Sequence, residues 1–182
     1  MHFTQLASVV LAALAIQGPL VLAAFDPLWE GVAIQDFQGN RFDIAYGSAA
    51  ERTPIQTLEP KRLSTQQWNV EMDFAAGHAR ILSRAAGTYM SFSNARVEDA
   101  RSPVCAQICG DKTETLWRLK QISEQGREFH IIEVKSGLAM TSWPKGNSSR
   151  IGQTTPLTLQ EHDSQAPQQR FEFLDLTGKP LV

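Results

Sequence analysis

After residue 24, hydrophobic and polar residues alternate in short runs separated by Gly, Pro, Asn or Asp. Examples of these runs are VAIQDF, RFDIAY, ARILSR and FHIIEV. A period of two places the hydrophobic side chains on one face of a strand, whereas helical periodicity is scarce. The pattern predicts an all-β sandwich or barrel of many short strands.

Three features recur in the same phase along the chain. Each copy contains a glycine that precedes a strand, a proline that enters the next strand, and an aromatic residue that closes the unit. These residues are Gly39, Pro54 and Trp68; Gly87, Pro103 and Trp117; and Gly137, Pro156 and Phe171. The spacing predicts three units of about fifty residues. One such unit cannot bury its apolar face alone, but three related by a pseudo-threefold axis can share a core.

The first 23 residues differ from the rest, since they are mainly apolar and contain no Asp, Glu, Lys or Arg. The run from Leu6 to Ile16 has the length of a signal-peptide core, and Val21-Leu22-Ala23 ends in a small residue at the cleavage position. A membrane anchor needs about 20 continuous apolar residues, and Gly18-Pro19 interrupts this run. We therefore predict a signal peptide over residues 1–23, a single mature domain over residues 24–182, and secretion.

Two further features of the sequence are interpreted on the assumption that the protein is secreted. Asn147-Ser148-Ser149 is an N-glycosylation sequon in a turn-rich segment, so we predict a glycan on Asn147. Cys105 and Cys109 are the only cysteines. An oxidising compartment favours a disulfide between them, but residues four apart on a regular strand lie too far from each other. A local disulfide at a bend and two buried thiols both remain open.

Charge and motif content argue against several classes of function. Seventeen basic residues against nineteen acidic ones, a net charge of -2, give no support for nucleic-acid binding. The histidines follow no metal-ligand spacing, and the chain lacks a G-x-S-x-G motif and a glycine-rich phosphate loop. We expect neither enzyme activity nor a metal or other cofactor.

The glycine-initiated strands and a recurring Q-x-W element resemble the ricin-B-type β-trefoil family of lectins and carbohydrate-binding modules. The element is complete in Gln66-Gln67-Trp68, altered in Gln169-Arg170-Phe171 and reduced in Thr115-Leu116-Trp117. The resemblance covers residues 31–175. It implies a β-trefoil that binds glycans without catalytic activity of its own.

The resemblance also implies where a sugar binds. The family uses an aspartate just after the glycine turn, and Asp43 occupies this place in the first unit, whereas Ser91 and Thr141 replace it in the others. Gln56 matches the polar residue of the middle strand, and Gln66 matches the amide of the Q-x-W element. We therefore expect at most one family-type site, a shallow one in the first repeat.

Each candidate residue also has a structural interpretation. A sugar site needs a carboxylate or amide for hydroxyl groups and an aromatic face for the C–H side of the ring. Asp43 either binds sugar or caps a turn, and Gln66 either touches the ligand or holds a loop. Tyr46 and Trp143 are each an exposed platform or a ring folded back on the barrel. If Asp43 is a surface residue, Asp43→Ala should leave the fold within about 1 kcal/mol.

Two other functions fit the same scaffold: a secreted β-trefoil protease inhibitor that uses exposed loops, and a structural or toxin-like frame. The Q-x-W elements favour the lectin, while the missing aspartates in the second and third units favour the alternatives. We predict a secreted carbohydrate-binding protein whose partners are glycans or glycoconjugates. Its oligomeric state is left open.

Overall fold

The computed structural model describes residues 25–92, 108–123, 127–144 and 155–181. Within these ranges the chain forms a twelve-stranded all-β structure. The first strands are β1 (Asp26–Asp36), β2 (Arg41–Ile44), β3 (Thr53–Leu58), β4 (Trp68–Asp73), β5 (His78–Ser83) and β6 (Tyr89–Phe92). They are followed by β7 (Ile108–Asp111), β8 (Trp117–Gln121), β9 (Glu128–Glu133), β10 (Ala139–Ser142), β11 (Thr155–Gln160) and β12 (Phe171–Leu174). The short 3-10 helices are η1 (Ala45–Gly47), η2 (Ser64–Gln66) and η3 (Pro167–Gln169).

Six strands close into a barrel. Antiparallel pairs run from β1 to β4, β5, β8, β9 and β12 and return to β1. Closure leaves no free edge in this ring of strands. The alternation of the sequence thus produces a barrel and not a sandwich.

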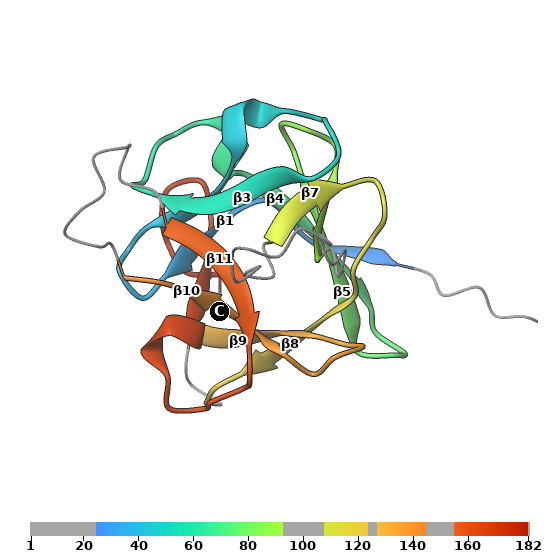
Figure 1. Cartoon of the computed structure of the whole chain (residues 1–182), viewed down its shortest axis with the longest axis vertical. Helices are drawn as coiled ribbons and strands as arrows, with labels where there is room; N and C mark the ends of the chain where they lie inside the picture. The colour runs from blue at the N-terminus through green and yellow to red at the C-terminus, as the bar shows by residue number, and fades with distance from the viewer. Residues whose placement is uncertain (1–24, 93–107, 124–126, 145–154, 182) are drawn as a thin grey trace, which may run out of the picture.

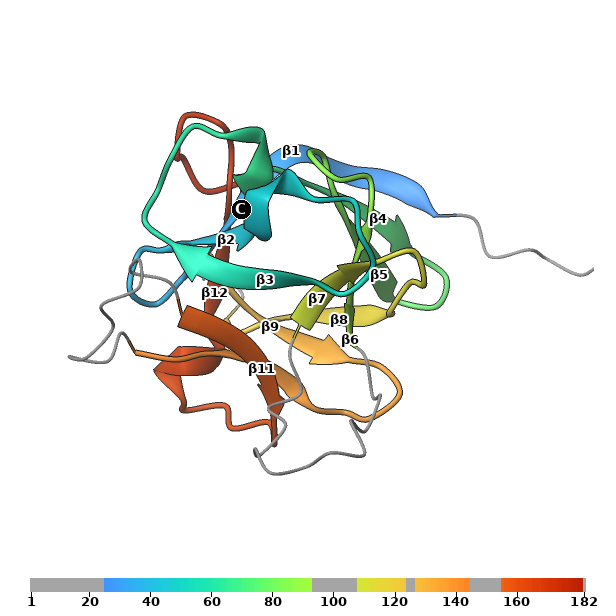
Figure 2. The same ribbon diagram turned by 45° about the horizontal axis from the view of Figure 1, so that its top comes forward.

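The remaining strands form three hairpins, β2–β3, β6–β7 and β10–β11. Strand β3 also pairs with β7 and with β11. Figure 1 shows β3, β7 and β11 around a common centre, and Figure 2 shows β3 beside both of its partners. The hairpins add Phe42, Met90 and Met140 to the core of the barrel.

The aromatic residues of the repeated pattern begin barrel strands. Trp68, Trp117 and Phe171 are all fully buried, as the sequence predicts. The indole nitrogen of Trp68 donates to the carbonyl of Phe42 at 3.2 Å, and that of Trp117 donates to the carbonyl of Met90 at 3.0 Å. Each tryptophan therefore joins a barrel strand to a hairpin.

The predicted glycine turns are also present. Gly39, Gly87 and Gly137 have φ values of 80°, 66° and 73°, in the left-handed region that glycine adopts without steric cost. The amide of Gly39 donates to the carbonyl of Asp36, and that of Gly137 to the carbonyl of Glu133, each at 2.9 Å. These turns connect each first strand to its hairpin.

Several sequence predictions fall outside the described residues. The predicted signal peptide over residues 1–23, Cys105 and the sequon at Asn147 belong to this group. Cys109 lies buried on β7, and the choice between a disulfide with Cys105 and two buried thiols stays open. In the described parts of the chain, no helix has the length and apolar character needed to cross a membrane.

Candidate functional site

Asp43 and Gln56, both predicted to contact a sugar, lie directly opposite each other on β2 and β3. Asp43 is only 5% exposed, so its expected place at the surface is wrong. The reason is the loop after β3: η2 packs against β2, and the Thr65 hydroxyl donates to the Asp43 carboxylate at 3.0 Å. Burial raises the pKa of Asp43, and hydrogen bonds from Thr65 and Gln66 partly oppose this rise.

Gln66 holds a loop through both ends of its amide group. Its oxygen accepts the backbone N–H of Lys61 at 2.7 Å, and its nitrogen donates to the carbonyl of Glu59 at 3.0 Å. The side chain is 1% exposed. The loop-holding alternative is therefore present, while a direct contact between Gln66 and a sugar stays a prediction.

Tyr46 projects fully into solvent from η1. Its φ of 56° lies in the left-handed region, which is uncommon for a residue other than glycine. Of the two alternatives for this ring, the exposed platform is the one observed.

Trp143 follows β10 and borders a surface hollow of about 560 Å³. The lining residues are Thr141, Trp143, Gln160, Glu161, Asp163, Ala166, Gln168 and Gln169. The indole is 40% exposed, and its N–H donates to the Thr158 hydroxyl at 2.8 Å. This bond fixes the ring against β11 while part of it stays exposed, and a stacking role for Trp143 stays a prediction.

The segment that carries Trp143 is anchored to the turn between β1 and β2. The Ser142 hydroxyl donates to one carboxylate oxygen of Asp36 at 2.7 Å, a buried bond. The other Asp36 oxygen accepts the amides of Gln38 and Asn40, each at 2.9 Å. The Gln38 side chain in turn donates to the Trp143 carbonyl at 3.1 Å. One buried carboxylate thus organises the support of the tryptophan.

Gln169 also lines the hollow. Its amide nitrogen donates to the Thr141 hydroxyl at 3.2 Å and to the carbonyl of Glu161 at 2.8 Å. Its oxygen accepts the amide of Asp163 at 2.9 Å. This pattern matches that of Gln66, so the altered Q-x-W element still orders its loop.

The hollow combines the groups that recognise a sugar. Trp143 offers an aromatic face, and Gln160 and Gln168 offer amides. Glu161 and Asp163 add carboxylates that accept hydrogen bonds from hydroxyl groups. From the sequence, Trp143 is a candidate, whereas the pair Glu161 and Asp163 fits a solvated strand edge or loop and Gln160 carries no signal beyond its place between a strand and the altered Q-x-W element.

The predicted site residues do not form one cavity. Gln56 pairs with Pro156 on β11, and the adjacent Leu157 pairs with Ser142, so the strands beside Asp43 and Trp143 are neighbours. Asp43, Tyr46, Gln56 and Gln66 nevertheless do not line the Trp143 hollow. The structure therefore separates the first-repeat position from the tryptophan.

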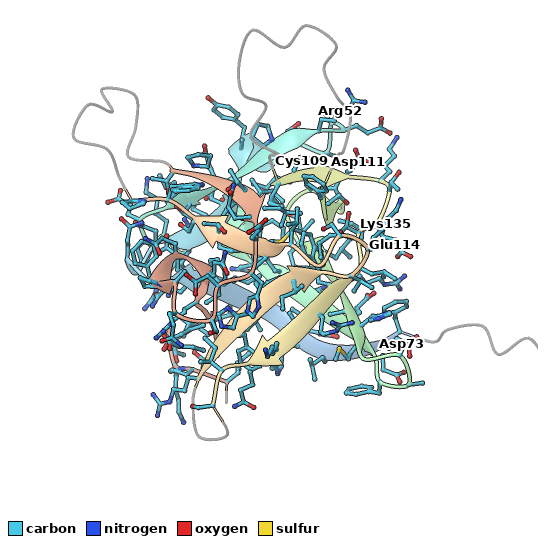
Figure 3. All side chains as sticks on the ribbon, turned by 60° about the horizontal axis from the view of Figure 1, so that its bottom comes forward. Arg52, Asp73, Cys109, Asp111, Glu114 and Lys135 are labelled. Carbon is cyan, nitrogen blue, oxygen red and sulfur yellow. The ribbon has the colours of Figure 1, made fainter. Side chains whose placement is uncertain are left out.

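A second hollow of about 410 Å³ lies over β6 and β7. Figure 3 shows Arg52, Asp111 and Glu114, which line it, on the same side of the molecule. Ser91, at the place of Asp43, donates to the carbonyl of Thr113. The aromatic side chain that lines this hollow in the described chain is the half-buried Phe92, so this surface is less suited to stacking than the Trp143 hollow.

A metal centre is not found in the described ranges, which contain no group of three or more His, Cys, Asp and Glu side chains that could hold an ion.

Comparison with known proteins identifies a matching family and solved structures with a similar fold. Residues 64–154 match the family described as ricin-type beta-trefoil lectin domain-like. The fold resembles that of the Rhizoctonia solani agglutinin, at 18% identity and a TM-score of 0.62 over 81% of this chain and 96% of that one. It also resembles the Macrolepiota procera ricin B-like lectin in complex with lactose, at 13% identity and a TM-score of 0.59 over 80% and 96%.

A designed threefold symmetric protein, ThreeFoil, is similar too, at 16% identity and a TM-score of 0.62 over 79% of this chain and 97% of that one. At such identities the likeness is one of fold. Comparison with curated proteins gives no match.

Proposed function

Because this chain belongs to the ricin-type β-trefoil lectin domain-like family, we propose that it is a secreted protein that binds glycans and has no catalytic activity of its own. The observation that carries the proposal is the exposed, hydrogen-bonded indole of Trp143 beside a hollow rich in amides and carboxylates. An aromatic face with hydroxyl-binding groups around it matches the two kinds of surface that a sugar ring presents.

We also propose that the twelve strands represent three repeats of about fifty residues with pseudo-threefold symmetry. Three strand pairs of the barrel, β1–β4, β5–β8 and β9–β12, support this reading, since one hairpin lies between the two strands of each pair along the chain. The equivalent burial of Trp68, Trp117 and Phe171 supports it as well. In this arrangement the Trp143 hollow belongs to the third repeat.

The first repeat supplies a second, weaker contact surface in this proposal. Asp43 and Gln56 face each other across two strands, and Tyr46 extends from the end of β2. Asp43 is the acidic residue that the family resemblance assigns to sugar binding. Gln66 would act there by holding the loop that carries Thr65.

The test of the function is a glycan array run on the mature protein beside a protease-inhibition panel. We expect binding to one class of glycans and no inhibition. Lactose is a suitable first ligand, because the similar Macrolepiota procera lectin was solved with it. Inhibition of a protease without glycan binding would replace the lectin proposal by the inhibitor.

Asp43→Asn tests the first-repeat surface. Asparagine keeps an oxygen for the Thr65 hydroxyl but removes a charge whose burial raises the pKa of Asp43. Because a raised folded-state pKa means that the ionised form destabilises the fold, the variant should be at least as stable as wild type at pH 7. We expect loss of the weaker glycan contact in calorimetric titration. Unchanged titration curves would remove Asp43 from the site.

Secretion predicts a defined amino terminus. Expressed in a eukaryotic secretory host, the protein should appear in the medium and begin within two residues of Ala24, because the apolar segment ends there. N-terminal sequencing checks this, and a protein that retains Met1 contradicts it. Enzymatic removal of N-glycans should lower its mass, while an Asn147→Gln variant should show no such change.

A further inference from the structure

Two histidines lie in contact behind the loop that walls the Trp143 hollow. The rings of His130 on β9 and His162 after β11 meet edge to face, with centroids 4.6 Å apart and an interplanar angle of 87°. His130 is only 2% exposed. Nδ1 of His130 and Nε2 of His162 are buried without a hydrogen-bond partner in the described chain. Unpartnered buried nitrogens reduce stability, so packing alone does not account for this pair.

The charges around the pair oppose its protonation. Lys120 on β8 lies directly across from His130, and Arg170 follows η3. Burial first, then the nearby His162, Lys120 and Arg170, lower the pKa of His130, and a hydrogen bond with the backbone of Gln169 opposes them. Two cations beside the rings also make this a poor site for a metal ion. The arrangement favours the neutral imidazole of His130.

The same loop connects the histidines to the hollow. His162 lies between Glu161 and Asp163, both of which line the hollow. His130 bonds to the backbone of Gln169, which also lines the hollow. Residues 161–170 therefore contribute both to the proposed glycan site and to the contacts of the histidine pair.

We propose that His130, packed against His162, is a pH-sensitive switch that keeps residues 161–170 in the glycan-binding arrangement while its ring is neutral and loosens them when its ring is protonated. The inference rests on the proposed function, since the glycan site is the surface that it regulates. A buried imidazolium next to Lys120 and Arg170 is costly. Movement of the loop brings water to the ring and relieves that cost.

The direction of the effect follows from linkage. The loosened loop binds protons more readily than the ordered loop, because the ordered state lowers the pKa of His130. The ordered loop is therefore fully favoured above about pH 6.5, the ordinary pKa of histidine. As the pH falls through the lowered pKa of His130, the ordered loop becomes less stable relative to the loosened loop. Glycan binding should be strong at neutral pH and weaker in acid.

Three carboxylates also face this region and must be separated from the histidines. Glu161 and Asp163 belong to the loop, and Glu128 pairs with Arg170 at 3.8 Å. Substituting the histidines while leaving these carboxylates in place isolates the imidazole contribution.

The experiment measures lactose, or the best glycan of the array, at pH 7.5 and pH 5.0 against the full mature protein. We expect the affinity of wild type to be clearly lower at pH 5.0 than at pH 7.5, because protonation of His130 favours the loosened loop. In the His130→Gln/His162→Gln variant the two affinities should agree within about twofold. The matched control is His78→Gln on β5, outside the pair, which should behave as wild type. A double variant with the wild-type pH dependence would overturn the switch.

A second readout does not involve glycan. The amide of Asp163 is bonded to the Gln169 side chain, so its hydrogen exchange reports on the loop. The amide of Gly77, bonded to Asp73 in the β4–β5 turn, is the reference. The ratio of the two exchange rates, each corrected for its intrinsic pH dependence, should be higher at pH 5.0 than at pH 7.5.

These readouts distinguish the two proposals. A pH-dependent exchange ratio without glycan binding at any pH rejects the proposed function but supports the switch. Glycan binding with a constant exchange ratio rejects the switch alone. If the double variant does not fold, NMR titration of the His130 imidazole in wild type decides: a pKa below 6.5 supports the switch, and a pKa at or above 6.5 overturns it.

Discussion

Replacing Trp68 with alanine is expected to lower the free energy of unfolding by about 3–5 kcal/mol. The side chain is fully buried in the barrel core, and its indole N–H bonds to the carbonyl of Phe42. The substitution both creates a cavity and leaves that buried carbonyl without its partner. Since a domain is held together by about 5–15 kcal/mol, the urea midpoint followed by circular dichroism should drop sharply.

Trp68→Phe is the matched control. It keeps most of the ring but loses the N–H, and Phe171 already occupies the corresponding position at the start of β12. We expect a cost of about 1–2 kcal/mol, in the range of one lost buried hydrogen bond. Trp117→Ala should resemble Trp68→Ala, because Trp117 is equally buried and bonds to the Met90 carbonyl. An unfolding midpoint close to wild type for either alanine variant would contradict a shared core.

Trp143→Ala is expected to weaken glycan binding roughly 30-fold, about 2 kcal/mol, as for a central aromatic residue of a binding site. The indole is the aromatic face of the hollow, and its bond to Thr158 holds it in place before ligand arrives. Calorimetric titration with the best glycan measures the loss. Because the ring is 40% exposed but its N–H bonds to the buried Thr158, the free energy of unfolding should fall by about 1–2 kcal/mol, less than for Trp68→Ala.

Two further variants test whether the loss of glycan binding is specific to the Trp143 side chain. Phe74→Ala removes another exposed aromatic side chain, in the turn between β4 and β5, and should leave binding unchanged. Trp143→Phe keeps an aromatic face but loses the bond to Thr158, so its affinity should lie between those of wild type and Trp143→Ala. If Trp143→Ala binds as wild type does, the glycan site lies elsewhere, and Asp43 in the first repeat becomes the principal candidate.

Much of the fold follows from local sequence. Alternation with a period of two predicts strands, since successive side chains of a strand point to opposite faces. Gly39, Gly87 and Gly137 mark turns because their backbone adopts positive φ. Trp68 and Trp117 are recognisable as core residues from their phase in the repeat. Each of these properties depends on residues close in sequence or on spacing that one can count.

The site depends on contacts that no local pattern contains. Asp43 is buried because Thr65, 22 residues later, folds over it. Trp143 is held in place because Thr158 binds its indole and Asp36, 106 residues before Ser142, anchors its strand. Sequence alone determined the strands, the turns and the core aromatics. Tertiary structure decided which side chains lose water and which find partners, because solvent exposure and long-range hydrogen bonds are set only when distant strands close into one barrel.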